Sequence, residues 1–308
     1  MAWLALIAVW FFWGTTYLGI RMALESFGPV HLICLRFAIS GFILLVGARI
    51  VGAHIPTGRE LWYTAATGLM LLGGGTGSLI FTEQWIPSGT AALIVVLGAF
   101  WMVGVEALTG GEKLHLPTFG GMLLGLAGIV VLVWPDLAGG LVNRGLVAGF
   151  LLLQFGSFSW AMGSVLQRRQ ATVAHPIVSG AIQQLAVGLA FLPVALILPE
   201  HPTVWTTRGT LALVWLIFFG SIIAYSAFIY ALDHMPIALV TTYNYVNPVV
   251  AVILGWFFYR ERFGIREVAA MAFVFSGVAV VKYFSGSRHQ KASSSETTPD
   301  QLAPTPAE

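Results

Sequence analysis

The sequence predicts an all-α integral membrane protein with ten transmembrane helices, arranged as two inverted repeats of five. The first observation is composition, because 57% of the 308 residues are hydrophobic and 9% are charged, against about 25% charged residues in an average soluble domain. The second is that the apolar residues gather in runs long enough to cross a bilayer core of about 30 Å as helices. The third is that the second half of the chain repeats features of the first.

The ten apolar runs are separated by short segments that carry charged residues or proline. Runs that are apolar on every side favour helices over membrane strands, which alternate in polarity. Proline stands near the start of five runs, where its missing N–H is one that a first helical turn leaves unpaired; these are Pro29, Pro87, Pro117, Pro176 and Pro236. The runs cover residues 3–24, 30–50, 61–82, 87–108, 117–134, 145–167, 176–198, 209–232, 236–259 and 265–284.

The internal repeat rests on matched residues at two nearly constant offsets. Five helices are an odd number, so the second copy enters the membrane from the opposite side, which is a recurring plan of secondary transporters. Chance similarity between apolar helices is the alternative, but the matches include proline, arginine and glutamate. Trp13, Arg21 and Pro29 correspond to Trp160, Arg168 and Pro176, each 147 positions later, and Pro87, Glu112 and Gly128 correspond to Pro236, Glu261 and Gly277, each 149 positions later.

The repeat divides the chain into residues 1–137 and 138–284, followed by a polar segment at 285–308. That segment is rich in Ser, Thr, Pro, Gln and Lys, a composition that cannot bury enough apolar surface to offset the entropy of ordering, and we expect a disordered tail. Lys and Arg residues are slightly more numerous in the loops that share a side with the N-terminus, which favours both termini in the cytoplasm. A net charge of +2 is too small for a nucleic-acid groove, so no nucleic-acid partner is expected.

Short motifs along the chain resemble those of the ten-helix EamA-type transporters of the drug/metabolite transporter superfamily. The motifs are Phe12-Trp13-Gly14-Thr15-Thr16-Tyr17, Arg36-Phe37, Gly111-Glu112, Asn247-Pro248 and Arg260-Glu261. The resemblance covers residues 3–284. It implies a permease of the bacterial inner membrane that moves small metabolites through a central cavity, in known members mostly as an exporter of amino acids or related compounds.

Candidate substrate-binding residues are polar or aromatic residues within the runs, since such groups usually face the interior of a helix bundle. Trp13 and Tyr17 form a helical stripe that Ser157, Trp160 and Ser164 mirror in the second repeat. Aromatic rings in such stripes can hold an apolar group or attract an ammonium group, and ordinary helix packing is the alternative. The full set is Trp13, Tyr17, Thr76, Ser78, Trp101, Ser157, Trp160, Ser164, Tyr225, Tyr243, Asn244 and Asn247.

Pro248 and Arg36 are interpreted as structural. Pro248 removes a helical hydrogen bond and clashes with the carbonyl of Asn244, so a kink satisfied by polar neighbours is expected there. Arg36 lies seven residues beyond Pro29, about 10 Å along a helix, and is expected to reach an interface or to pair with a helix end.

The titratable residues exclude several chemistries. Glu83, Glu106 and Asp233 lie near the ends of their runs, where water is expected to keep them ionised, and the histidines lie in loops, at run ends or in the tail. We therefore expect no metal site, no cofactor and no enzymatic activity, and transport of a neutral or zwitterionic substrate without obligatory proton exchange. The expected partners are a small-molecule substrate and the lipid bilayer, and the internal pseudosymmetry permits a working monomer. Alternatives left open are a sugar or nucleotide-sugar carrier, a channel or scaffold, and a membrane-embedded enzyme.

Overall fold

The computed structural model describes residues 1–110, 116–138, 144–170, 174–235, 240, 242–261 and 264–295, and consists there of helices joined by turns and loops. No strand occurs within these ranges. Glu112 and Pro236, which contribute to the predicted repeat, lie outside them, as does Gly111 of the quoted motifs.

The first half of the chain contains helices that follow the predicted runs. They are α1 (Ala2–Leu24), α2 (Pro29–Ile50), α3 (Gly58–Gly68), the π-helix η1 (Leu69–Thr76), α4 (Gly77–Thr82), α5 (Ser88–Val95), α6 (Gly98–Leu108) and α7 (Leu116–Ala138). The second half contains α8 (Arg144–Arg169), α9 (Pro176–Ile197), α10 (Thr207–Trp215), the π-helix η2 (Leu216–Ala224), α11 (Tyr225–His234), α13 (Tyr243–Tyr259) and α14 (Ile265–Ser295).

Among the described residues, seven helical segments are long and apolar enough to cross a membrane. They are Ala2–Leu24, Pro29–Ile50, Gly58–Thr82, Ser88–Leu108, Arg144–Arg169, Pro176–Ile197 and Thr207–His234. Of the other three predicted runs, 117–134 and 265–284 fall on α7 and α14, and residues 243–259 of the run 236–259 form α13. Helix α14 continues to Ser295, past the start of the predicted disordered tail. Extending an existing helix adds one hydrogen bond for each residue fixed and avoids a new nucleation step, which composition alone does not reveal.

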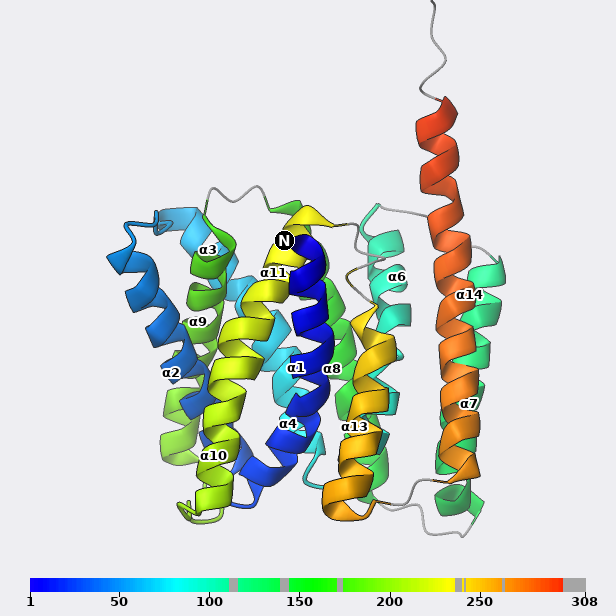
Figure 1. Ribbon diagram of the computed structural model, residues 1–308, viewed down its shortest axis with the longest axis horizontal. Helices are drawn as coiled ribbons and strands as arrows, with labels where there is room; N and C mark the ends of the chain where they lie inside the picture. The colour runs from blue at the N-terminus through cyan, green and yellow to red at the C-terminus, as the bar shows by residue number, and fades with distance from the viewer. Residues whose placement is uncertain are drawn as a thin grey trace, which may run out of the picture.

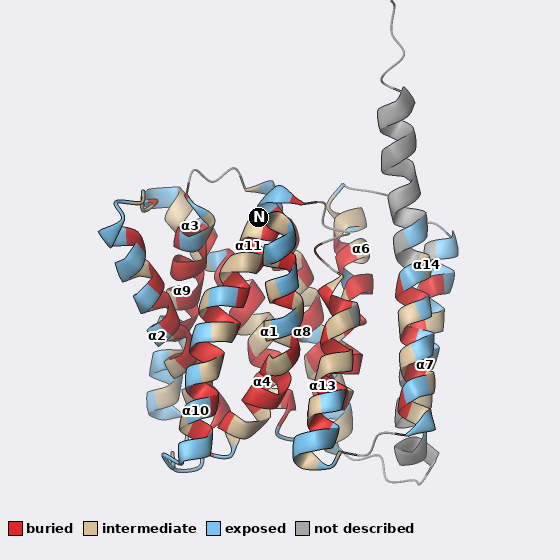
Figure 2. Ribbon diagram, in the orientation of Figure 1, coloured by how far each residue is buried: buried red, intermediate tan, exposed pale blue. Residues whose placement is uncertain are grey.

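The helices run side by side in a single bundle (Figure 1). Helix α2 packs against α9 at one end of the bundle, α7 packs against α14 at the other, and α1 and α8 lie between these pairs. The interior surfaces of the central helices are buried and the outward surfaces are exposed (Figure 2). Large apolar side chains cover this outer surface, for example Phe11, Phe42, Leu151 and Phe257, each more than half exposed. An apolar exterior over a long helical bundle suits lipid contact.

Proline marks the helix starts as predicted. Pro29 and Pro176 occupy the first helical turns of α2 and α9, Pro87 is the N-cap of α5, and Pro117 follows the first residue of α7. Proline has no backbone N–H, so at these positions it adds no unpaired donor to the first helical turn.

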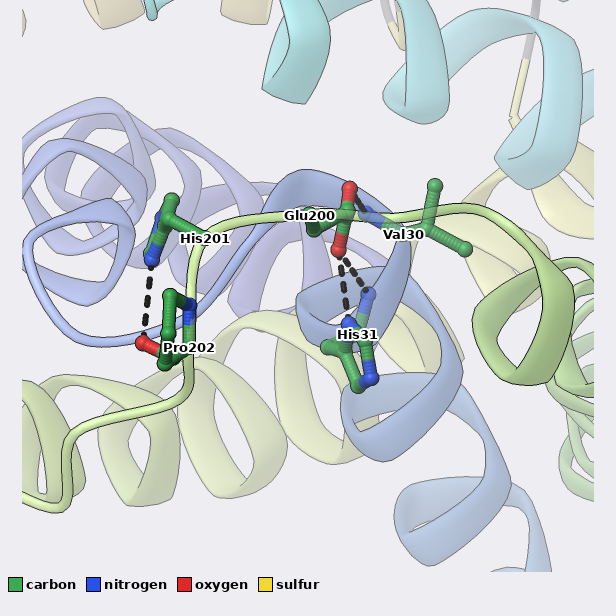
Figure 3. Close-up of polar contacts among 5 residues, drawn as sticks. All are labelled: Val30, His31, Glu200, His201 and Pro202. Atoms are coloured by element: carbon green, nitrogen blue, oxygen red, sulfur yellow. Dashed lines mark hydrogen bonds and ion pairs between the residues drawn. The ribbon is translucent and has the colours of Figure 1, made fainter.

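Two of these helix starts are capped by a glutamate from the other half of the chain. Glu200 accepts hydrogen bonds from the backbone N–H groups of Val30 at 2.8 Å and His31 at 3.2 Å, and also contacts the His31 ring at 2.7 Å (Figure 3). Glu261 accepts from the backbone N–H groups of Ser88 at 3.1 Å and Gly89 at 3.2 Å. A carboxylate at a helix N-terminus satisfies the free N–H groups and interacts favourably with the helix dipole.

Candidate functional site

The helices line a partly open interior cavity of about 110 Å³. One water needs about 10–15 Å³ on this measure, so the space accommodates a small molecule. The lining comes from both halves of the chain, and Arg36 is the one charged residue among the lining side chains that the structure describes. The cavity is lined by Trp13, Thr16, Tyr17, Ile20, Arg36, Phe37, Leu72, Gly75, Thr76, Leu79, Val95, Gly98, Met102, Leu153, Gly156, Ser157, Trp160, Gly220, Ser221, Tyr225, Tyr243, Asn244 and Asn247.

Aromatic rings form one wall of the cavity. The Trp13 ring packs edge-on against Trp160 at a centroid distance of 5.4 Å and against Tyr243 at 5.2 Å. Trp13 Nε1 also donates a hydrogen bond to the Gly220 carbonyl oxygen at 3.1 Å. The indole is therefore held by both packing and a hydrogen bond, and the helices α1, α8 and α13 meet around it.

The two π-helical segments both reach the cavity. Leu72, Gly75 and Thr76 of η1 and Gly220 and Ser221 of η2 belong to its lining. π-helical turns are rare and often occur at functional sites. No sequence signal indicated them, apart from the glycine run at residues 73–75.

Glycine is required where these segments meet large side chains. A Cβ atom on Gly75 would lie 2.8 Å from a ring carbon of Trp160, and one on Gly220 would lie 2.9 Å from Arg36 Nη2. Contacts this short force a neighbour to move. Gly75 and Gly220 therefore allow Trp160 and Arg36 to occupy their places beside the cavity.

The position of the Arg36 side chain differs from the prediction that it reaches a membrane interface. Its side chain is only 4% exposed, it lines the cavity, and its Nε donates to Ser221 Oγ at 2.8 Å. The direction of the side chain depends on α9 and η2, which pack against α2. Sequence spacing within one helix does not contain that information.

Two adjacent glutamines, which the sequence reasoning missed, support the cavity wall from α9. Gln184 Nε2 donates to the Ser221 carbonyl oxygen at 3.1 Å, and Gln183 Oε1 accepts from the Tyr225 hydroxyl at 2.7 Å. Both glutamines are fully buried. Their occurrence as a polar pair within the apolar run 176–198 is the signal that could have identified them.

Asn247 presents an unused acceptor at the cavity. Its side chain is 3% exposed, and its Oδ1 has no hydrogen-bond partner among the described residues. Asn244 lies beside it in the lining, and Pro248 lies inside α13, near its N-terminal end. The kink expected at Pro248 stays a prediction.

The structure places nine of the twelve candidate residues at the cavity and three elsewhere. Trp101 is partly exposed, and its Nε1 donates to Gln154 Oε1 at 3.0 Å. Ser78 is buried where α4 approaches Gly156 of α8, and Ser164 is fully buried with no partner for its hydroxyl in the described residues. The nine at the cavity are Trp13, Tyr17, Thr76, Ser157, Trp160, Tyr225, Tyr243, Asn244 and Asn247.

Glu83 contradicts the expectation that water surrounds the carboxylates at the run ends. It is 1% exposed, and neither of its carboxylate oxygens has a hydrogen-bond partner in the described part of the chain. Arg21 lies beside it but donates to its backbone carbonyl oxygen, at 3.0 Å. A buried carboxylate without hydrogen bonds is more stable when protonated. Proximity to the end of a helix in the sequence does not show what packs over that end.

The described residues contain no group of three or more histidine, cysteine, aspartate or glutamate side chains that could hold a metal ion. The arrangement is instead that of a small-molecule site: aromatic walls, hydroxyl and amide groups, and one cation, within a membrane-type helical bundle. Such sites combine an apolar lining with a few polar groups that fix orientation.

Comparison with known proteins identifies the family to which this helical membrane protein belongs. The EamA-like transporter family matches residues 1–134 and 147–283, so the chain belongs to it. The chain is accordingly an integral, multi-pass membrane protein, and the family indicates a transporter rather than an enzyme.

Relatives along nearly the whole chain carry transporter names. An inner membrane transporter named YedA of Escherichia coli (strain K12), described as uncharacterized, is 36% identical over 90% of this chain and 89% of its own. A probable amino-acid metabolite efflux pump of the same organism is 25% identical over 91% of this chain and 93% of its own. A solved crystal structure with 24% identity matches with a TM-score of 0.67 over 94% of this chain and 98% of its own, and supports the fold.

Proposed function

We propose that the protein is a secondary transporter that moves amino acids or related neutral or zwitterionic metabolites by alternating access. The interior cavity carries this proposal, because its lining offers aromatic rings for an apolar group and polar groups for the charged ends of such a molecule. The name of the amino-acid metabolite efflux pump among its relatives points to the same substrate class.

Ten membrane spans in two inverted repeats form part of the proposal. The helices α7, α13 and α14 fall on the three further apolar runs. The π-helical segments η1 and η2 lie within corresponding spans, Gly58–Thr82 and Thr207–His234. Glu200, which follows α9, caps α2. Glu60 of α3, the helix after α2, accepts from the backbone N–H of Ala174, just before α9, at 3.4 Å.

Cysteine labelling tests the inverted arrangement. His54 follows α2 and His201 follows α9, and both are exposed. With Cys34 replaced by serine, His54→Cys should react with an impermeant maleimide from the cytoplasmic side and His201→Cys from the opposite side. Labelling of both from one side would contradict the inverted repeat, and the reverse assignment would contradict cytoplasmic termini.

Counterflow in proteoliposomes tests the transport function. Vesicles containing the purified protein and loaded with an unlabelled amino acid should take up the labelled amino acid faster than vesicles without protein, over a panel that includes aromatic and aliphatic members. Trp13→Phe removes the indole N–H at the cavity, and we expect a loss of exchange of about tenfold, equivalent to about 1.4 kcal/mol. Trp101→Phe is the matched control outside the cavity and should exchange normally. Absence of exchange for every compound would contradict the proposed function.

The proposal includes no obligatory proton exchange. The cavity lining contains no carboxylate and no histidine among the described residues, and Glu83 does not belong to it. Accumulation of substrate above equilibrium under an imposed pH gradient would contradict this part of the proposal.

A further inference from the structure

An incompletely hydrogen-bonded arginine at the cavity, Arg36, narrows the substrate class. Arg36 lines the cavity, is 4% exposed, and donates from Nε to Ser221, but its Nη1 has no hydrogen-bond partner in the described part of the chain. No ion pair within the described ranges includes Arg36. Among the described residues, Arg36 therefore places one cation at the cavity, with a buried donor that makes no hydrogen bond.

A buried guanidinium is unfavourable unless its donors and its charge are compensated. Arg36 is compensated in part, by Ser221 Oγ, by the Phe37 ring 5.0 Å from its Cζ and by electrostatic interaction with Glu83, but Nη1 has no hydrogen-bond partner among the described residues. The bundle nevertheless fixes Arg36 in place: Ser221 holds Nε, Gln184 holds the Ser221 backbone, and Gly220 leaves room for Nη2. A group held so firmly with a free donor is prepared for an anionic ligand, and a guanidinium matches the geometry of a carboxylate.

The other unused group of the cavity is an acceptor. Asn247 Oδ1 is buried without a partner in the described residues, and the rings of Trp13, Trp160 and Tyr243 contribute to the wall. A ligand that satisfies all these features has one carboxylate, an apolar body and an N–H or O–H donor. A phosphate ester would bring more negative charge than a single arginine balances.

We propose that Arg36 binds the carboxylate of a monocarboxylate substrate whose apolar part lies against the aromatic wall, with a donor group of the substrate at Asn247. This inference rests on the proposed transport function and specifies its substrate. It distinguishes carboxylates from amines and uncharged analogues, which the general proposal does not.

Binding to the purified full-length protein tests the carboxylate site without transport. Isothermal titration compares 3-phenylpropionate with 3-phenylpropionamide, which differ only in the carboxylate. We expect the acid to bind at least about tenfold more tightly than the amide. Equal affinities, or no binding of the acid, would overturn the proposal.

Substitutions at Arg36 identify the residue responsible. Arg36→Gln should remove the preference for the acid, and Arg36→Lys, which keeps the charge, should retain part of it. Arg49→Gln, at an exposed position of the same helix, is the matched control and should retain it fully. A preference for the acid that persists in Arg36→Gln would assign the anion site to another residue. If Arg36→Gln does not fold, the test rests on Arg36→Lys and on the comparison of the acid with the amide in the wild-type protein.

Counterflow separates this inference from the general one. Exchange of L-phenylalanine together with equal exchange of L-phenylalaninamide would contradict the carboxylate site and leave the transport function intact. A preference for the acid in titration, with no exchange of any amino acid, would support the site and contradict the transport function.

Discussion

The helix-start caps and the interior cavity differ in whether their polar groups have hydrogen-bond partners. At the caps, both carboxylate oxygens of Glu200 and Glu261 accept hydrogen bonds from the free N–H groups of α2 and α5. At the cavity, Arg36 Nη1 and Asn247 Oδ1 are buried without partners among the described residues. The caps therefore complete their polar groups within the protein, whereas the cavity keeps one donor and one acceptor that a bound ligand can complete.

The largest effect on stability is expected at a completed site. Glu261→Gln replaces one of two acceptor oxygens with a donor and removes a charge from the N-terminus of α5. One buried N–H left unpaired and the lost dipole interaction together amount to about 2–4 kcal/mol of unfolding free energy. Denaturation by SDS in mixed micelles measures this. An unchanged unfolding free energy would show that the Glu261 cap does not stabilise the folded protein.

At the cavity, a substitution that removes an unpaired polar group should reduce transport rather than stability. Asn247→Ala removes an acceptor that makes no hydrogen bond within the described protein, so folding should lose little while amino-acid exchange falls by about tenfold. Counterflow and SDS denaturation of the same preparation give the two values. A loss of stability as large as that of Glu261→Gln would show that Asn247 is structural.

A smaller effect is expected where the backbone makes room for Arg36. Gly220→Ala places a Cβ within 2.9 Å of Arg36 Nη2 and should displace the guanidinium, weakening binding of 3-phenylpropionate about threefold. Titration of the variant provides the measurement. Gly104→Ala, where a Cβ meets nothing within 4 Å, is the control, and equal affinities in the two variants would contradict the role of Gly220.

The smallest effect is expected at Glu83, which belongs neither to a helix-start cap nor to the cavity lining. Its carboxylate is buried near Arg21 without a hydrogen-bond partner in the described residues, and it lies outside the cavity lining. Glu83→Gln keeps its shape and removes only a group that burial already disfavours as an anion, so the unfolding free energy should change by less than about 1 kcal/mol. Uptake under a pH gradient should match the wild type, and loss of gradient-dependent accumulation in this variant would identify Glu83 as a proton-carrying group.

The sequence predicts the helical membrane fold well because long apolar runs leave few alternatives. Trp13 and Trp160 were also predicted at the cavity, since each belongs to a polar stripe and the two mirror one another. The roles of Arg36 and Glu83 were not, because both depend on which neighbouring helix covers the side chain. Gln183 and Gln184 stand out as a polar pair in an apolar run, but only their contacts with Tyr225 and Ser221 show that they support the cavity wall.

The central claim is that transported substrate occupies the interior cavity. Ser157→Cys, in a chain with Cys34 replaced by serine, places a thiol in the cavity lining, and Ser164→Cys provides a buried control outside it. The rate at which a small methanethiosulfonate reagent modifies Cys at position 157 should fall as an exchanged amino acid is added, at the concentration that half-saturates counterflow. An unchanged rate at saturating substrate would show that the substrate binds elsewhere.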